Sequence, residues 1–474
     1  MSNDHETPVR RSGVRRFIGF LSYGLTALVL VAAVVLIASQ LESDRSAPTA
    51  PREIVVTPEE APATEAPAEV GEAAPEPTAG AAPPVAVTEA APAPAAEPTP
   101  AAPPPELEAA APAPDIAASD DIAAKSRADT FGDADAPFTI VKVYYATDRK
   151  PTGESDPNQK YGGDRGTLVL GEAEVSIPRD HRLGELEAPS IWKLEFTEDP
   201  EKHVVLQKAS EVIPEVFYKS VREKVAAAPD KSAFIFIHGY NVLFKDAARR
   251  TAQMTYDLGF PGAPVFYSWP SQGTTLGYTV DENNIQWTQA NLKKFIKDFA
   301  DQSQAENIYL VAHSMGNRAL TGAVKELVQE SPDIRNRFKE IILAAPDIDA
   351  EIFKRDIAPY IVTATPTVTL YASSNDKALI ASKEVHGYAR AGDSGSGLVI
   401  VNGVDTIDST NAETDFVGHT YYASSKSIIA DIFNLIHRRL RPDKRPGLKG
   451  VDEKDGRYWE FLGVDQAVGA GSTP

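Results

Sequence analysis

From Phe138 to about residue 440, short apolar runs alternate with amphipathic stretches. The apolar runs are rich in Val, Ile, Phe and Tyr, which is typical of buried strands. They are AFIFIHG (233–239), PVFYSWP (264–270), IYLVAHS (308–314), EIILAAPD (340–347), TVTLYASS (367–374) and LVIVNGVDTID (398–408). The amphipathic stretches predict helices at 244–258, 282–302, 316–331, 350–360 and 423–440. This alternation predicts an α/β fold, in which a mostly parallel sheet carries helices on both faces.

A β-rich region precedes this alternating pattern. Four segments read as strands because β-branched and aromatic residues dominate them. They are FTIVKVYYATDR (138–149), GTLVLGEAEVSIP (166–178), IWKLEF (191–196) and HVVLQ (203–207). In parallel sheets, ligands bind beyond the carboxyl ends of the strands, so candidate chemistry is sought at that edge.

The N-terminal part contains one long apolar run, FIGFLSYGLTALVLVAAVVLIA, from Phe17 to Ala38. About 20 apolar residues suffice for a helix to cross a bilayer, so we expect a transmembrane helix at residues 17–40. A cleaved signal peptide is the alternative, although its apolar region is usually shorter. Arginines precede the run and acids follow it, which predicts a cytoplasmic N-terminus (1–16). We therefore expect a single-pass inner-membrane protein whose remaining chain lies in the periplasm.

Residues 41–136 form an Ala-, Pro- and Glu-rich segment. It holds 17 of the chain's 37 prolines between Pro51 and Asp120, and residues 44–130 contain no aromatic residue. Such a composition cannot form a packed core and favours extended polyproline II, which predicts a disordered linker. One folded domain is then expected at 137–440, followed by a polar C-terminal tail at 441–474 whose few apolar residues can fold back onto the domain.

Charge and cysteine content exclude several function classes. The formal net charge of the 474 residues is −20, but residues 44–136 hold 18 acidic against 4 basic residues. The acidity therefore belongs mostly to the linker, and no basic patch favours a nucleic-acid partner. The chain has no cysteine, which excludes disulfides, thiol catalysis and zinc-thiolate sites. No metal-ligand cluster, P-loop or G-x-G-x-x-G motif is present either, so we expect no cofactor.

The string LVAHSMGNRAL holds the strongest chemical signal. A short apolar strand ends at Ala312, a helical pattern begins near Gly316, and Ser314 lies between them. This is the strand–turn–helix setting of the nucleophile elbow, in which the residues two before and two after the serine must be small. Ala312 replaces the usual first glycine. The alternative is an ordinary strand-to-helix turn with Ser314 as helix N-cap.

A nucleophilic serine needs a base and an acid that orients it, in the chain order Ser, acid, His for this motif. Three histidines follow Ser314. His419, in a loop after the last strand, is the expected base, with His386 as the alternative; His437 sits in a helix beside arginines. Asp376, after the strand TVTLYASS, is the expected acid. Asp347, after the preceding strand, is the next candidate.

The negative oxygen of an acyl-transfer intermediate needs two backbone N–H donors. We assign one to Met315, the residue after the nucleophile, and the other to Tyr240, in the loop that follows strand 233–239. The residues expected to brace these turns or line the pocket are His238, Gly239, His313, Asp347 and Trp269.

Eight motifs in this order resemble those of a bacterial α/β-hydrolase family of unknown function, described as esterase- or lipase-like. They are VYYATDRKPTG, VSIPRDHRLG, FIFIHGYN, FYSWPSQG, AHSMGNRAL, LAAPDID, LYASSNDKAL and GHTYY, within residues 138–440. The resemblance implies an α/β-hydrolase fold with Ser314 as nucleophile, Asp376 as acid and His419 as base. It supplies no substrate.

These observations predict a membrane-anchored serine hydrolase that cleaves an acyl ester through an acyl-enzyme intermediate. Its expected partners are a small-molecule or lipid-like acyl substrate and the membrane, through residues 17–40. The alternative is a non-catalytic envelope-anchored domain that binds a protein or cell-wall partner.

Overall fold

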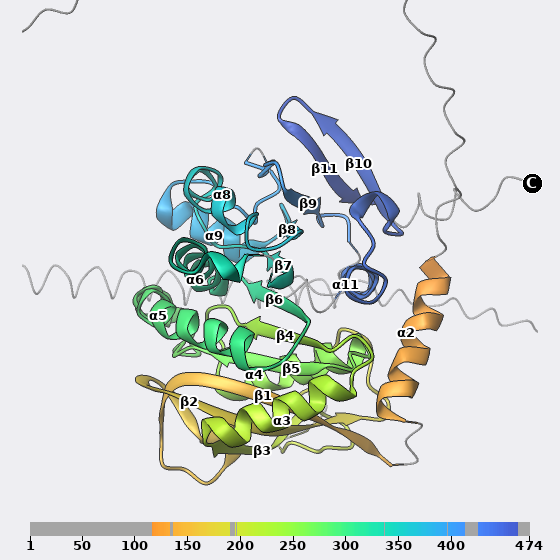
Figure 1. The fold of residues 1–474 in the computed structure, drawn as a ribbon, viewed down its shortest axis with the longest axis vertical. Coiled ribbons are helices and arrows are strands. Elements are labelled where there is room, and N and C mark those ends of the chain that lie inside the picture. Colours follow the sequence, from red (N-terminus) through yellow and green to blue (C-terminus); the bar gives the residue numbers. More distant parts are fainter. Residues whose placement is uncertain are drawn as a thin grey trace, which may run out of the picture. The chain divides into compact units, whose positions relative to one another are not determined.

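An eleven-stranded sheet runs through the computed structural model of the protein (Figure 1). The strand order is β10-β11-β9-β8-β7-β6-β4-β5-β1-β2-β3. The structure describes residues 116–132, 136–189, 195, 197–335, 337–395, 397–412 and 425–462, all of which belong to one of the chain's two compact units, Pro104–Pro474.

The centre of the sheet is parallel and its two margins are antiparallel. The strands are β1 (Phe138–Pro151), β2 (Tyr161–Pro178), β3 (Val205–Val212), β4 (Ser232–Ile237), β5 (Ala263–Ser268), β6 (Asn307–His313), β7 (Phe338–Ala344), β8 (Val368–Ala372), β9 (Val404–Asp408), β10 (Leu448–Glu453) and β11 (Gly456–Phe461). Parallel pairs run from β1 through β5, β4, β6, β7, β8 and β9 to β11. The pairs β1–β2, β2–β3 and β10–β11 are antiparallel.

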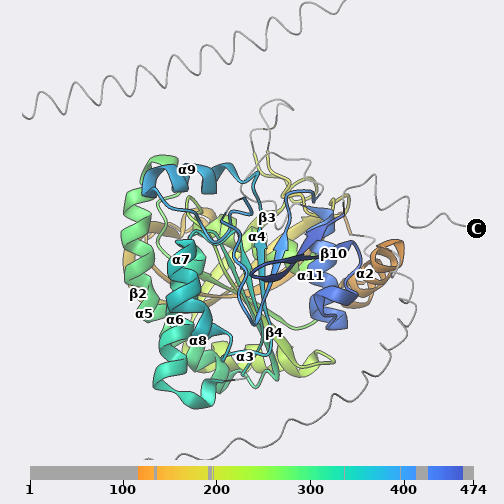
Figure 2. The same ribbon diagram turned by 90° about the horizontal axis from the view of Figure 1, so that it is seen from above.

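Helices cover both faces of this sheet. The longer ones are α2 (Ile116–Phe131), α3 (Pro214–Ala227), α4 (Phe244–Asp257), α5 (Tyr278–Gln302), α6 (Gly316–Glu330), α9 (Lys377–His386) and α11 (Lys426–Arg438). The shorter ones are η1 (Pro157–Gln159), η3 (Thr275–Gly277), η4 (Pro332–Ile334), α7 (Ala350–Ile352), η5 (Phe353–Ile357), α8 (Ala358–Ile361) and η6 (Pro442–Lys444). One apolar core packs α3, α5, α6 and α8 against the sheet, and a second packs α4 and α11 against the opposite face (Figure 2).

Burial on both faces explains why the central strands read as continuous apolar runs. Every residue of β4 and β5 is buried, and so are the last six residues of β6 and the last five of β7. A strand with helices on both sides has no solvent-facing side chains, so the alternation of polar and apolar residues disappears. The arrangement confirms the predicted mostly parallel sheet with helices on both faces.

Several predicted elements differ from the observed ones. The run 398–408 forms a strand only over β9, because Gly403, with φ of +85°, turns the chain just before it. The predicted helix 350–360 is divided into α7, a π-helical turn and α8, since Pro359 in the first turn of α8 lacks a backbone donor. Helices α3 and α9 were not predicted at all.

The prediction of a disordered linker up to residue 136 is wrong for residues 116–131, which form helix α2. The helix is held by tertiary contacts with the loop that follows α4. Ser126 Oγ donates to Gly259 O at 2.9 Å, and the Phe131 and Tyr256 rings lie 5.2 Å apart. A helix without an amphipathic pattern of its own can be stabilised by such docking, which composition does not reveal.

The described part of the predicted tail also belongs to the sheet. Strands β10 and β11 form a hairpin, and β11 pairs with β9 through Trp459 and Glu460, so the domain extends beyond residue 440. Residues 1–115, most of the predicted strand 191–196, and residues 413–424 and 463–474 lie outside the described residues. The predicted membrane helix 17–40 is among them, and none of the helices that are described is long and apolar enough to span a bilayer.

Candidate active site

Ser314 occupies a tight turn between the carboxyl end of β6 and the start of α6. It is 2% exposed and has a left-handed backbone, with φ of +51°, which is costly for a residue other than glycine. A Cβ atom at Gly316 would lie 2.4 Å from His238 O, so only glycine fits there. The strained serine and the close helix–loop approach are the geometry that the elbow motif predicts.

Hydrogen bonds hold this turn rigidly from its backbone. Ser314 N donates to Ala344 O at 2.9 Å, at the end of the neighbouring strand β7. Ser314 O accepts from Asn317 N at 3.1 Å and from Asn317 Nδ2 at 2.9 Å. The backbone N–H of Asp347 points to the same oxygen at 3.3 Å. The side chain of Asn317, which the sequence analysis did not single out, therefore holds the turn by donating to the Ser314 carbonyl oxygen.

The loop after β4 lies directly against the serine. A Cβ atom at Gly239 would be 3.0 Å from Ser314 Cβ and 2.8 Å from His313 Nδ1, so the loop can approach this closely only with glycine. Among the described residues, neither Tyr240 N–H nor Met315 N–H has a hydrogen-bond partner. The loop that carries Tyr240 therefore lies against the serine turn that carries Met315.

His238 braces the start of this loop as a neutral ring. Its Nδ1 lies 2.7 Å from Gly239 O, which can only accept, so Nδ1 carries the proton. The ring stacks on Trp269 at 5.0 Å between centroids, and Trp269 Nε1 donates to His238 O at 2.7 Å. Burial, and next the Arg149 charge, holds the pKa of His238 well below its ordinary value. Trp269 is fully buried, so it supports the loop from the core instead of lining an open pocket.

Asp376 lies at the carboxyl end of β8 and begins α9. Its Oδ1 accepts from Ala378 N and Leu379 N, both at 3.0 Å, so it is the helix N-cap. The side chain is 1% exposed. Its strand is separated from β6, which ends at the serine, only by β7. An acid fixed by a helix N-terminus at this edge suits the role of orienting a base.

Asp347 is bound to other groups. Its Oδ2 accepts from Tyr278 OH at 2.7 Å and from Arg318 Nη2 at 2.9 Å, and its Oδ1 accepts from Ser382 Oγ at 2.6 Å. Arg390 Nε lies 3.1 Å from Oδ1. Burial opposes ionisation, but the two arginines outweigh it and lower the pKa of Asp347. A carboxylate held between two cations braces the site, which favours Asp376 over Asp347 as the acid.

Two of the three histidines after Ser314 are engaged elsewhere. His386 Nδ1 lies 2.7 Å from Ser382 O and its Nε2 lies 2.8 Å from Glu282 Oε1, so both ring nitrogens face acceptors. His437 Nε2 lies 2.8 Å from Leu258 O, and burial lowers the pKa of its ring. The contacts described for both rings are with groups other than Ser314, which favours His419 as the base. His419, the expected base, lies outside the described residues.

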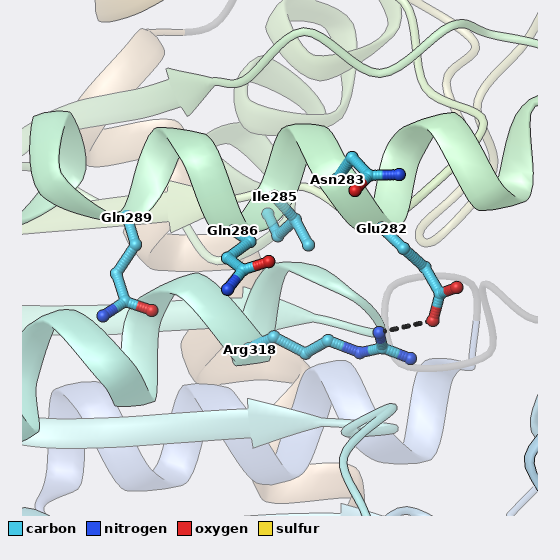
Figure 3. Close-up of a pocket in the computed structure, with 6 residues that line it drawn as sticks. All are labelled: Glu282, Asn283, Ile285, Gln286, Gln289 and Arg318. Atoms are coloured by element: carbon cyan, nitrogen blue, oxygen red, sulfur yellow. Dashed lines mark hydrogen bonds and ion pairs between the residues drawn. The ribbon is translucent and has the colours of Figure 1, made fainter.

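A polar pocket of about 430 Å³ opens between α5 and α6 (Figure 3). Its lining residues are Glu282, Asn283, Ile285, Gln286, Gln289 and Arg318. Arg318 joins the pocket to the serine turn, because Nη1 pairs with Glu282 at 2.8 Å while Nε donates to Asp347 O at 2.6 Å. No group of His, Asp and Glu in the described part of the chain has the spacing of a metal site.

The sequence analysis missed two buried charged residues beside the loop after β4. Arg149, at the end of β1, and Asp281, in the first turn of α5, are both 0% exposed. The only signal for Arg149 was its place in the motif VYYATDRKPTG, which carried a family resemblance but no assigned role. Asp281 had no signal, because an acid in the first turn of a helix is ordinary.

Residues 214–439 match one known protein family. They match the model of a family described as an alpha/beta hydrolase of unknown function (DUF900). The match confirms the resemblance to an α/β-hydrolase family, and together with the strand order it establishes the α/β-hydrolase fold. Among curated proteins, none matches the sequence of this chain.

Solved structures that resemble the chain are remote. Esterase B from Lactobacillus rhamnosis is 12% identical, with 68% of this chain and 93% of that chain covered and a TM-score of 0.27. A protein described as a cell surface hydrolase from Lactobacillus plantarum is 13% identical, covering 45% of this chain and 94% of that chain at a TM-score of 0.29. A hydrolase of the alpha/beta superfamily from Xanthomonas campestris is 14% identical, covering 44% of this chain and 99% of that chain at a TM-score of 0.24. With TM-scores this low, none of the three bears on what this chain does.

Proposed function

We propose that the protein is a serine hydrolase that cleaves an acyl ester, with Ser314 as nucleophile, His419 as base and Asp376 as acid. The observation that carries the proposal is the strained turn at Ser314, beside which the Met315 and Tyr240 amides have no hydrogen-bond partner among the described residues. Left-handed backbone at a buried serine is retained only where the surrounding structure enforces it, and such strain is typical of functional sites. The match to an alpha/beta hydrolase family supports hydrolysis as the reaction class.

The proposed reaction has two halves. His419, oriented by Asp376, takes the proton of Ser314 Oγ as that oxygen forms a bond to the ester carbonyl carbon. The carbonyl electrons move to the oxygen, which then accepts hydrogen bonds from the Tyr240 and Met315 amides. Collapse of the intermediate breaks the ester C–O bond, and the alcohol leaves with the proton from His419. Water then repeats the sequence on the acyl-enzyme and releases the acid.

The rest of the chain suggests where this reaction takes place. We propose that residues 17–40 anchor the protein in the inner membrane and that the hydrolase domain is periplasmic. The support is the long apolar run with arginines before it and acids after it. Protease treatment of spheroplasts should digest the domain of the full-length protein, and resistance of the domain would contradict the periplasmic placement.

Labelling with a fluorophosphonate probe tests the enzyme proposal. The wild type should label and should hydrolyse short-chain esters, because the probe phosphonylates an activated serine. Ser314→Ala should lose both properties. Ser303→Ala is the matched control, since Ser303 is equally buried but caps the far end of α5, and it should label as the wild type does. Wild-type protein that neither labels nor hydrolyses any ester of a panel would refute the enzyme and leave the binding-module alternative.

A further inference from the structure

The backbone around Tyr240 is fixed by buried side chains on its C-terminal side. Asn241 N donates to Asp281 Oδ2 at 3.2 Å, and Val242 N donates to Ser271 Oγ at 3.1 Å. Val242 O accepts from Arg149 Nη2 at 2.7 Å. The two amides that follow Tyr240 are therefore held in place, while the Tyr240 N–H has no hydrogen-bond partner among the described residues.

Asn241 shows that this loop is held under strain. Its φ is +57°, a left-handed conformation that asparagine tolerates better than most residues but that still has an energetic cost. A loop in this state relaxes unless other interactions oppose it. The hydrogen bond from Asn241 N to Asp281 is the interaction that the structure supplies at that residue.

Asp281 connects the loop to its surroundings through three donors. Besides Asn241 N, its carboxylate accepts from Ser271 Oγ at 2.6 Å and from Gln272 N at 2.8 Å. Burial raises the pKa of Asp281, and these hydrogen bonds oppose the rise. Three donors aimed at one buried side chain favour the charged, accepting form. The carboxylate thus ties α5 to the loops after β4 and β5.

Arg149 holds the same loop from the other side. Its guanidinium donates to Ser268 Oγ at 2.8 Å, Gly162 O at 3.0 Å, Ser271 O at 2.9 Å and Val242 O at 2.7 Å. Within the described residues, no carboxylate lies at ion-pair distance from it. Burial lowers the pKa of Arg149 to about 10, which still leaves the group charged at neutral pH.

A buried cation without a contacting counter-ion is costly, so its retention calls for a reason. Here it lies beneath the loop that carries Tyr240, and His238, the nearest ring, stays neutral beside it at 3.4 Å between Nη2 and Nε2. Positive charge fixed near a developing oxyanion stabilises the transition state more than the neutral substrate.

We infer that Arg149 and Asp281 are positioning residues of the hydrolase. They hold the Tyr240 amide in the direction required by the oxyanion, and Arg149 adds a fixed positive charge behind it. This inference rests on the proposed function, because it assigns the loop a role only in an acyl transfer that passes through Ser314.

Two variants test the role of these residues, Asp281→Asn and Arg149→Lys. Both should lower kcat for an ester by about 10- to 100-fold, the effect expected of a misdirected group, with KM changed by less than about 3-fold. A trifluoromethyl ketone, which adds to the serine as a bound oxyanion, should lose affinity in proportion to kcat/KM. Ser271→Ala is a milder variant. It removes the hydrogen bonds to Val242 N and Asp281 without changing charge, so its kcat should lie between that of these two variants and that of the wild type.

Matched controls separate positioning from stability. Asp431→Asn and Arg445→Lys alter a buried Arg–Asp ion pair away from the loop, and they should lower the melting temperature while kcat per folded molecule stays at the wild-type value. Wild-type kcat in folded Asp281→Asn and Arg149→Lys would overturn the inference, and so would equal losses in the controls. A wild type that fails to label would instead refute the proposed function itself.

Discussion

Two of the buried arginines in this domain, Arg149 and Arg445, are surrounded by different groups. Arg445 lies between η6 and β10, and its Nη1 pairs with Asp431 Oδ2 at 2.9 Å, where Tyr371 OH also donates at 2.6 Å. Arg149 lies at the other side of the sheet, at the end of β1, and in the described part of the chain its guanidinium contacts only carbonyl oxygens, a hydroxyl and the His238 ring. The charge of Arg445 is neutralised by a contacting carboxylate, whereas within the described residues Arg149 contacts none.

The effect of burial on the two guanidinium groups differs accordingly. Burial lowers the pKa of Arg149 to about 10, with distant acids opposing the fall only in part. For Arg445, burial also lowers the pKa, but Asp431 together with the other acidic groups around it outweighs burial, and the net shift is upward. A neutralised pair is a packing element that joins α11 to the sheet edge. An uncompensated cation keeps its field, and that field acts on the neighbouring loop.

The largest expected effect is on stability at the neutralised pair. Arg445→Met leaves the Asp431 carboxylate buried without a counter-charge, which should reduce the free energy of unfolding by about 3–5 kcal/mol. Denaturant unfolding of both proteins measures the loss. In Arg445→Met/Asp431→Leu, where both charges are gone, most of the stability should return. If the double variant is as unstable as the single one, the ion pair is not the source of the loss.

The pH dependence of stability should also originate on the Arg445 side of the sheet. Glu340, 5% exposed on β7, has its pKa raised to about 7, first by burial, while Thr367, Thr369 and Arg445 oppose the rise. A carboxyl whose folded pKa exceeds its unfolded value stabilises the fold when protonated, so this stability is present below pH 4.5 and is lost as the pH rises through 7.

Glu340→Gln measures this contribution. Between pH 5 and pH 8 the wild type should lose about 2–3 kcal/mol more than the variant, from the linkage of about 1.4 kcal/mol per pKa unit. Urea unfolding across that range gives the comparison. Parallel curves for the two proteins would show that Glu340 is not the titrating group.

The comparison can be sharpened by giving Arg149 the neutralising partner that it lacks. Ser268 Oγ accepts from Arg149 Nε at 2.8 Å, so Ser268→Asp places a carboxylate against the guanidinium. Ser268→Asn has the same shape without the charge and is the control. If the uncompensated charge assists the oxyanion, the kcat of Ser268→Asp should be about 10-fold below that of Ser268→Asn, which corresponds to about 1.4 kcal/mol in the activation barrier. Equal kcat in the two variants would limit the role of Arg149 to holding the loop.

The smallest effect on stability and kcat is expected where an arginine–carboxylate ion pair is exposed to solvent. Arg457 and Asp452 on the β10–β11 hairpin form a two-pronged contact, at 2.6 and 2.8 Å, in full contact with solvent. Water screens such pairs, so Asp452→Asn should leave the thermal midpoint and kcat within experimental error of the wild type. A clear drop in the midpoint would mean that the hairpin is more tightly docked than its exposure indicates.

Local sequence pattern predicted the parts of the fold that depend on burial and local geometry. The central strands were found because helices on both faces make them continuously apolar, and the turn at Ser314 because its small neighbours are required sterically. Helix α2 was not found, since docking against the residues around Gly259 stabilises it. The hairpin β10–β11 was not found either, because β10 is exposed and polar at most positions and the pairing of β11 with β9 is remote in sequence.

The sequence by itself determined the α/β order of elements, the resemblance to an α/β-hydrolase family and the choice of Ser314 as candidate nucleophile. It assigned Asp376 and the two amides from their places after particular strands, and the structure brings Gly239 against Ser314 as that assignment requires. Only the tertiary structure decided that Asp347 and His386 are engaged by other groups, and that Arg149 and Asp281 clamp the loop beside the serine. The physical reason is that burial and pairing depend on residues distant along the chain, from 29 positions for Arg318 and Asp347 to 119 for Arg149 and Ser268, which no local pattern records.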